Sequence, residues 1–398
     1  MGQKVLYIFS IFLIGCSAQI SGDEPVLSEV PLIHIYTNTP LEYISKTQYT
    51  DGTIQIESDE PYLCLESSSV KLRGRGNTTW SFPKKPFQIK FSEPKELLGM
   101  SSARKWIFLA NYSDKSLLRT ETAFELSRRS EINWTSNSRF VELYLNAEYL
   151  GVYQLVEKIE AVTNRVNDGE GFLLECNREN RLGDDGVYFE SNFHFYTIKE
   201  PEVSFGDPQF NLIKNYIKTA EEVLFGTDFQ DTLIGYRKYL DTESFVDWYI
   251  IHEITKNSES AWGTSGYMNY VPGEKIKMGP VWDFDLSLGN TYGTSTEDFV
   301  IKHKGWYAQL FQDSSFVHQV KQRYTYFYSL KDEILEKVAS NAYLLDEPQE
   351  RNFIKWPILG VWVWPNAVTF NEYNHEVAYL KDWCSERMDW LNQAIDDL

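Results

Sequence analysis

Positive charge, cysteine and histidine are all scarce in this sequence. Its 38 lysines and arginines stand against 57 aspartates and glutamates, which gives a formal net charge of -19. Nonspecific nucleic-acid binding is excluded, because it needs an extended positive surface that displaces counterions from phosphates. The chain has 4 cysteines and 6 histidines, and no Cys-x-x-Cys or histidine-rich spacing points to a structural zinc site.

The N-terminus carries an apolar run that follows Lys4, ends at Cys16 and is too short to cross a bilayer comfortably. Its last four residues, LIGC, resemble a bacterial lipobox. The resemblance implies a signal peptide over 1–15, lipidation of the Cys16 thiol and a polar, acidic tether over 16–28. An uncleaved anchor and a chance cysteine are the alternatives. We therefore expect a protein of the cell envelope, held by a lipid anchor and facing the periplasm or the cell surface.

Three cysteines remain after Cys16, namely Cys64, Cys176 and Cys384. An odd number gives no disulfide framework, although one bridge is compatible with an oxidising compartment. Three buried thiols are the alternative.

Positive charge is concentrated in one stretch, residues 71–90, with the sequence KLRGRGNTTWSFPKKPFQIK. Gly74 and Gly76 each follow an arginine there, so backbone N–H groups can approach a ligand closely where positive charge gathers. This combination favours an anion, and phosphate most naturally. A solvated basic turn is the alternative. The stretch has no acid and six basic residues: Lys71, Arg73, Arg75, Lys84, Lys85 and Lys90.

Alternating apolar residues predict an antiparallel sheet in the first part of the chain, interrupted by one helix over 115–130 that Ser113 or Asp114 would cap. A hairpin is expected around Asn146-Ala147-Glu148. The strands are expected at 31–37, 53–58, 62–67, 70–76, 87–91, 105–112, 140–146, 149–159 and 171–177, with further short strands at 187–191 and 194–199.

From Asp207 onward the apolar spacing becomes helical, over 208–225, over 241–257 with Asp241 as the cap, and in the remainder to the C-terminus. Residues 275–290 predict a hairpin strand that ends in the acids of the Trp-Asp-Phe-Asp motif. The predicted class is α+β, with a strand-rich part over 29–176 and a helical part over 177–398. A Gly-rich loop, a strand lysine, a helix carrying glutamate and a distant aspartate, in this order, are typical of phosphoryl transfer.

Several stretches resemble the CotH spore-coat-type kinases, an atypical protein-kinase-like family. The resemblance implies one domain over 29–398 with an atypical two-lobed kinase-like fold, a strand-rich N-lobe and a mainly helical C-lobe. It implies transfer of phosphate from ATP, with Mg²⁺, to serine or threonine hydroxyls of a protein acceptor. The matching stretches are RGRGNTTW, KKPFQIKF, ANYSDKSLLRTETAFELSRR, VELYLNAEYLGVYQLVEKI, MGPVWDFDLSLGN, RNFIKWPILG with WPN, and the closing YLKDW and ERMDWL.

The family resemblance assigns roles to individual residues. Asp283 falls where the family holds its metal, and a carboxylate suits Mg²⁺ because this hard cation prefers oxygen ligands. Asp285 is a second metal candidate. Lys90 is the leading phosphate contact. The other expected nucleotide contacts are Arg73, Arg75 and Lys85, with Glu121 or Glu125 as the partner of the lysine.

The sequence departs from the family pattern after the helix over 241–257. Where an aspartate would orient the accepting hydroxyl, the only acid is Glu259, and a shift of one residue in register would put Ser260 there instead. We expect Glu259 to act as the general base. The alternative is a weak or inactive pseudokinase or an adhesin. Glycan binding through Trp362 and Trp364 is a third possibility, but burial in a core would explain these tryptophans.

Overall fold

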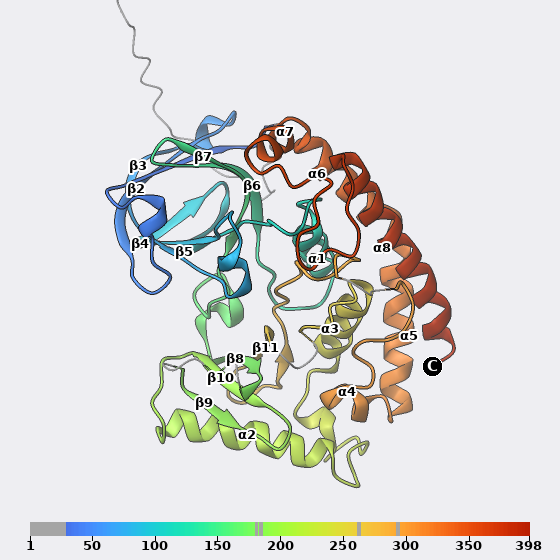
Figure 1. Ribbon diagram of the computed structural model, residues 1–398. Helices are drawn as coiled ribbons and strands as arrows, with labels where there is room; N and C mark the ends of the chain where they lie inside the picture. The colour runs from blue at the N-terminus through green and yellow to red at the C-terminus, as the bar shows by residue number, and fades with distance from the viewer. Residues whose placement is uncertain (1–28, 180–181, 183–185, 261–263, 292–294) are drawn as a thin grey trace, which may run out of the picture.

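The chain is α+β, as predicted, with a strand-rich first part and a helical second part (Figure 1). The computed structural model describes residues 29–179, 182, 186–260, 264–291 and 295–398. The predicted signal peptide, Cys16 and the tether over 16–28 lie outside the described residues. Among the residues described, no helix combines the length and apolarity that a membrane span needs.

The first part is a closed seven-stranded barrel rather than an open sheet. All of its pairings are antiparallel except β1 with β6, which run parallel and close the barrel. One face of each strand points inward, as for Phe87 and Ile89 on β4, and these apolar side chains fill the interior. In order around the barrel, the strands are β1 (Leu32–Thr37), β2 (Thr50–Glu57), β3 (Leu65–Gly74), β4 (Phe87–Leu97), β5 (Met100–Leu109), β7 (Glu148–Glu157) and β6 (Ser138–Leu145).

The hairpin between β6 and β7 is confirmed. Asn146 and Ala147 form its two-residue turn, and both have positive φ, of 52° and 66°. This is the geometry of a type I′ turn, whose twist matches that of the flanking strands. The predicted strand over 62–67 is wrong, because Pro61–Leu63 form a 3₁₀ turn and β3 starts only at Leu65.

Helix α1 (Arg119–Arg128) begins later than expected. Leu117 has a φ of 64°, which interrupts the helical path before Arg119. Asp114 still supports the helix start, because its Oδ2 accepts a hydrogen bond of 2.9 Å from the Arg119 N–H. Its Oδ1 accepts a second bond, from the guanidinium of Arg119, at 2.5 Å. Arg119 and Asp114 form a fully buried ion pair at the end of the barrel.

A second sheet of five strands lies below the barrel in Figure 1, with helix α2 (Pro208–Leu224) along it. β8, which the sequence analysis placed at the end of the strand-rich part, pairs here with β10 and β11. All pairings are antiparallel, in the order β12 (Lys277–Met278), β11 (Gly266–Tyr270), β8 (Phe172–Asn177), β10 (Phe195–Glu200) and β9 (Tyr188–Glu190).

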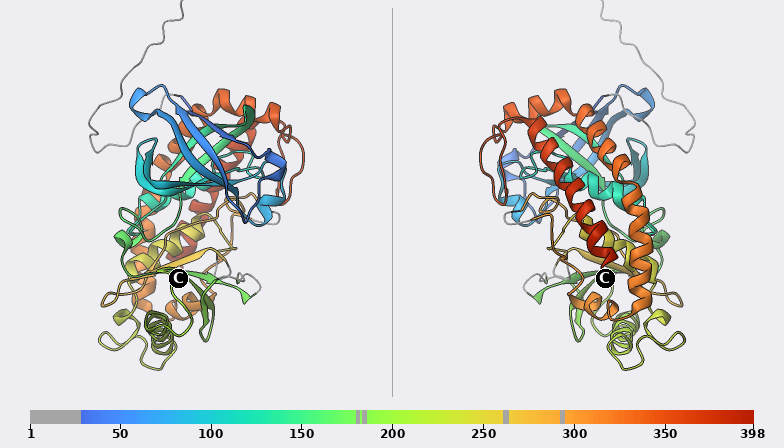
Figure 2. Two further views of the ribbon diagram at one scale, coloured as in Figure 1. Left: turned by 90° about the vertical axis from the view of Figure 1, so that its left-hand side faces the viewer. Right: turned by 90° about the vertical axis from the view of Figure 1, so that its right-hand side faces the viewer.

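Helix α3 (Thr242–Ile254) is buried at the centre of the second part. Asp241 is its N-cap as predicted, with Oδ1 accepting from the Ser244 N–H at 3.0 Å. The long C-terminal helix passes along one side of the molecule, next to α5 and α6 (Figure 2). The remaining helices are α4 (Gly305–Leu310), α5 (Ser314–Ser329), α6 (Lys331–Leu344), α7 (Asp346–Lys355) and α8 (Tyr373–Asp396).

Two expectations about individual residues can be settled here. Trp362 and Trp364 are not core residues, since 61% and 47% of their surface is exposed. They lie in the segment between α7 and α8. Among the described residues no disulfide forms, so Cys64, Cys176 and Cys384 are free thiols, the last two of them buried.

Candidate active site

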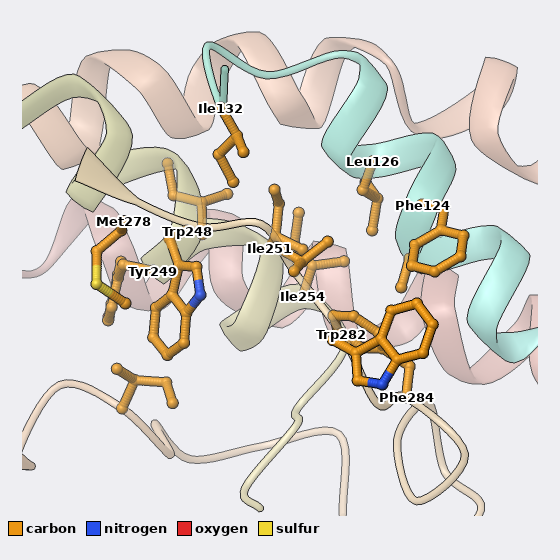
Figure 3. Packing of buried hydrophobic residues seen from close by; sticks show 14 of the residues in the cluster. Phe124, Leu126, Ile132, Trp248, Tyr249, Ile251, Ile254, Met278, Trp282 and Phe284 are labelled. Atoms are coloured by element: carbon orange, nitrogen blue, oxygen red, sulfur yellow. The ribbon is translucent and has the colours of Figure 1, made fainter. Parts of the chain in front are cut away.

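The Trp-Asp-Phe-Asp motif does not lie on a strand. β12 ends at Met278, and the chain then turns, with a φ of 70° at Asp283. Trp282 packs on Phe124 of α1, with ring centroids 6.0 Å apart (Figure 3). Phe284 packs on His252 of α3, with ring centroids 5.3 Å apart. Because both apolar neighbours are buried, the left-handed backbone leaves the Asp283 carboxylate exposed between them.

Three polar side chains hold the backbone and the carboxylate of this motif. Asn257, just beyond α3, donates through Nδ2 to the carbonyl oxygen of Asp283 at 2.9 Å. Asn290 donates to the carbonyl oxygen of Asp285 at 2.6 Å. Ser265 donates through Oγ to Asp283 Oδ2 at 3.1 Å. The sequence reasoning missed all three: Asn257 and Asn290 are the last residues of the segments predicted as a helix and a strand, and Ser265 lies between these segments.

The basic loop after β3 reaches this motif. The guanidinium of Arg75 lies over the Trp282 ring, 5.7 Å from its centroid, and is attracted by the Asp283 carboxylate. Burial lowers the pKa of Arg75, and the charge of Asp283 acts against this effect. Two stretches far apart in the sequence thus place a cation and a carboxylate next to each other.

Negative charge gathers around Asp285. Burial raises the pKa of Asp285 well above its ordinary value, and the nearby carboxylates of Asp283, Glu259 and Asp114 raise it further. Such a carboxylate is stabilised in its charged form by a bound cation. The donor chemistry at Asp283 and Asp285 therefore fits a divalent metal ion.

A cation held here would need further oxygen ligands from a bound molecule or from water. Among the described residues, no group of three or more acidic, histidine or cysteine side chains could hold a metal ion alone. Mg²⁺ in phosphate-transferring sites is commonly bound by one or two carboxylates together with substrate phosphates. Asp283 and Asp285 supply two carboxylates of this kind.

Glu259 and Ser260 have different environments. Ser260 is fully buried, and its Oγ is hydrogen-bonded to Asn257 Nδ2 at 3.1 Å and to the Trp282 carbonyl oxygen at 3.4 Å. Glu259 is exposed, and its charge acts on Asp285. Glu259, the residue expected to act as the general base, thus offers an accessible carboxylate, whereas Ser260 is closed off inside the protein.

The family model described as CotH kinase protein matches residues 72–391, most of the chain. The chain belongs to the CotH kinase family. Membership supports a kinase-like enzyme at the level of the family. A search of the curated proteins finds no match. The matched range includes the basic loop, α1, Glu259 and the Trp-Asp-Phe-Asp motif.

In this CotH kinase family member, the glycines of the basic loop serve packing first. The Gly74 N–H donates to the Ser45 carbonyl oxygen at 2.8 Å, and the Arg75 N–H donates to the Pro86 carbonyl oxygen at 3.2 Å. The indole of Trp80 lies directly on Gly74. These two N–H groups are therefore bonded within the protein, and it is the Arg75 side chain that extends to the motif.

Replacing Gly74 with alanine tests this packing. The added Cβ would lie 2.2 Å from Trp80 Cη2, so the indole must move. We expect the free energy of unfolding to fall by about 1–3 kcal/mol, the usual cost of overpacking. Urea denaturation measures it. Gly266→Ala is the control, since its Cβ would meet nothing closer than 3.5 Å. Equal stability of the two variants would contradict the account.

The other predicted nucleotide contacts have partners of their own within the first part of the chain. Lys85 Nζ donates to the Trp80 carbonyl oxygen at 2.7 Å, and the Arg73 guanidinium lies 4.8 Å from the Tyr49 ring centroid. Lys90 of β4 lies directly opposite Lys71 on the neighbouring strand β3. Lys71 is four residues before Arg75, a separation of about 13 Å along an extended chain. The strand register therefore places Lys90 beside Lys71 rather than beside Arg75.

The predicted ion pair between Lys90 and a glutamate of α1 is not formed. Glu121 binds the guanidinium of Arg128, the hydroxyl of Ser138 and Gln154 Nε2, the last at 2.9 Å. Glu125 lies 3.1 Å from Arg128 and 2.9 Å from Arg129. Both glutamates are therefore paired with arginines at the C-terminal end of α1, Arg128 and Arg129.

Proposed function

We propose that this protein is an exported kinase that transfers phosphate from ATP to a serine or threonine hydroxyl of a protein acceptor. The observation that carries the proposal is the Arg75 guanidinium lying over Trp282, where it is attracted by the Asp283 carboxylate, with Asp285 two residues further along the same motif. A cation beside one carboxylate, with a second carboxylate in the same motif, suits a nucleotide phosphate and its metal ion. A barrel that supplies the basic loop and a helical part that supplies the carboxylates are also compatible with a two-lobed kinase-like fold.

Each residue has a defined task in this proposal. Asp283 and Asp285 would hold Mg²⁺, whose charge would offset that of the transferred phosphate. Arg75 binds phosphate oxygens from the barrel side. Glu259 accepts the proton of the attacking hydroxyl at a carboxylate oxygen and orients that hydroxyl. Asn257 and Ser265 fix the position of Asp283.

The proposed setting follows from the N-terminus. Lipidation of Cys16 would attach the protein to a membrane of the cell envelope, so its acceptor would face the same compartment. A Cys16→Ala chain that still fractionates as a lipid-modified species would contradict this assignment.

The direct test of the function is transfer of labelled phosphate. The full chain, purified in detergent, is incubated with labelled ATP and Mg²⁺, alone and with a serine-rich peptide. We expect label on the protein or on the peptide. Absence of label on both, with a folded protein, would overturn the kinase proposal for these acceptors.

The role of Glu259 predicts the effect of its amide. Glu259→Gln removes the proton acceptor and keeps the size of the side chain, so transfer should fall by about 10²-fold. Glu259→Asp keeps the carboxylate and should retain more activity than the amide. Single-turnover rates measure the step. Glu336→Gln, an exposed position on α6, is the control. An undiminished rate in Glu259→Gln would remove Glu259 from the mechanism.

A second function is favoured by one observation. The exposure of Trp362 and Trp364 is typical of a binding surface, so a noncatalytic surface protein is the alternative. A thermal-shift titration with ATP and Mg²⁺ separates the two, because a ligand that binds only the folded state raises the unfolding temperature. No shift, together with no transfer, would favour the noncatalytic function.

A further inference from the structure

Three lysines lie side by side on the outer face of the barrel. Lys90 of β4 is directly opposite Lys71 of β3 on one side and Lys105 of β5 on the other. The inward positions beside them, such as Leu72 and Ile89, fill the barrel interior, so the lysines point outward. We call Lys71, Lys90 and Lys105 the lysine row.

Like charges directly opposite each other on neighbouring strands destabilise a sheet. The structure neutralises only the ends of the lysine row. Lys71 lies 3.6 Å from Asp51, and Lys105 lies 2.6 Å from Glu160. Lys90, in the middle, has no ion pair among the described residues. A row of this kind is unfavourable for the fold alone, which makes a binding role the better explanation.

The lysine row continues toward the candidate active site. Along β3, alternate residues share one face, so Lys71 and Arg73 point the same way and Arg75 follows at the end of the strand. Arg75 in turn lies over Trp282 beside Asp283. Positive charge thus runs from the lysine row to the candidate active site over about 13 Å, or four residues of extended chain.

We propose that the lysine row binds an acidic segment of the acceptor protein. The segment extends along β3, with its carboxylates about four residues from the hydroxyl that receives the phosphate. This assignment rests on the proposed function and adds to it a substrate class, namely acceptors with acidic residues near the modified serine or threonine.

Charge complementarity favours a short acidic segment over an anionic membrane. The protein carries a net charge of -19, so an extended anionic bilayer would be repelled by most of its surface. A peptide touches only a narrow surface, and charges beyond about 10 Å are screened at physiological salt. The lysine row is not needed for the ATP phosphates, because the proposal assigns these to Arg75, which follows the C-terminal end of β3, and to the motif carboxylates beside it.

The test compares two peptides that differ only in charge. Both contain one serine. One carries three glutamates beginning four residues from it, and the other has glutamines in their place. With the full chain in detergent, we expect kcat/KM for the glutamate peptide to be about tenfold higher at low salt, as for a few exposed charge pairs. In the double variant Lys71→Gln/Lys90→Gln this preference should disappear. Lys95→Gln, farther along β4, should keep it.

The outcomes separate the two proposals. If no peptide is phosphorylated, the anisotropy of a fluorescent glutamate peptide measures the docking by itself. If the Lys71→Gln/Lys90→Gln variant loses this binding and the Lys95→Gln variant keeps it, the lysine row is supported as a docking site even though the kinase function fails. Equal binding of the glutamate and glutamine peptides would overturn the proposed docking of an acidic segment. Binding of phosphatidylserine vesicles in place of the peptide would also overturn it.

Stability gives a further readout. Removing the central charge relieves repulsion, so Lys90→Gln should unfold at the same or a higher temperature than the native chain. A lower unfolding temperature would show a structural role for Lys90 and would overturn the proposal.

Discussion

Replacing Asp283 with asparagine is expected to lower phosphate transfer by about 10²- to 10³-fold, the loss that follows removal of one preorganised charge-stabilising group. The change removes the negative charge that faces Arg75 and would hold the metal ion. Asparagine is the right substitution because Asp283 has a φ of 70°, and asparagine tolerates this left-handed conformation far better than alanine does. The effect of the charge is then measured without backbone strain.

A matched control is available at Asp298. It is also exposed and has a φ of 67°, so Asp298→Asn makes the same chemical change in the same backbone conformation. Initial rates at saturating ATP and Mg²⁺ are compared for both variants and the native chain. An Asp283→Asn enzyme that is folded and as active as Asp298→Asn would remove Asp283 from the proposed metal site.

The local parts of the fold were predictable because their signals lie within a few residues. The Asn146-Ala147 turn and the Asp241 cap are of this kind: each is a short sequence with one strongly preferred geometry. Closure of the barrel was not predictable, since β1 pairs with β6 across more than a hundred residues. Periodicity identifies a strand and its two faces, but it does not name the partner.

In the candidate site, too, residues that belong to short motifs were predictable, and residues placed by the tertiary fold were not. Arg75 and Asp283 were named from short motifs, and the structure brings them together. Lys90 was named from its position on a strand near the loop, and the register of β3 against β4, which the sequence does not reveal, places it opposite Lys71 rather than beside Arg75. Asn257, Ser265 and Asn290 were missed because a lone polar residue after a helix or a turn has no pattern of its own.

Arg387→Met is expected to destabilise the folded chain by about 3–5 kcal/mol, the usual cost of leaving one member of a buried ion pair uncompensated. Arg387 of α8 and Glu253 of α3 have fully buried side chains, 2.9 Å apart. Arg387 also donates to the carbonyl oxygens of Thr296 and Asp298, at 2.9 and 2.8 Å. The pair therefore joins two helices and the loop that follows the motif.

The same pair supports the candidate site. Glu253 lies near the end of α3, where the Thr255 carbonyl oxygen accepts from the Leu288 N–H at 2.8 Å and Asn257 binds Asp283. Loss of Arg387 would leave a buried carboxylate at this point. We therefore expect transfer activity to fall together with stability in Arg387→Met.

The loss of stability should also depend on pH. Burial raises the pKa of Glu253 above its ordinary value of 4.5 even with Arg387 present, and without the arginine this pKa rises further. At pH values between the pKa of Glu253 in the unfolded chain and its higher pKa in the folded chain, the folded state binds more protons than the unfolded state. The free energy of unfolding therefore falls as the pH rises through this range. The variant Arg387→Met should thus lose more unfolding free energy relative to the native chain at pH 8 than at pH 5. Urea unfolding at both pH values measures the difference. The control is Arg104→Met, which removes an exposed ion pair with Glu93 and is expected to cost about 1 kcal/mol or less. Equal deficits at both pH values, or a deficit no larger than that of the control, would show that Glu253 does not depend on Arg387.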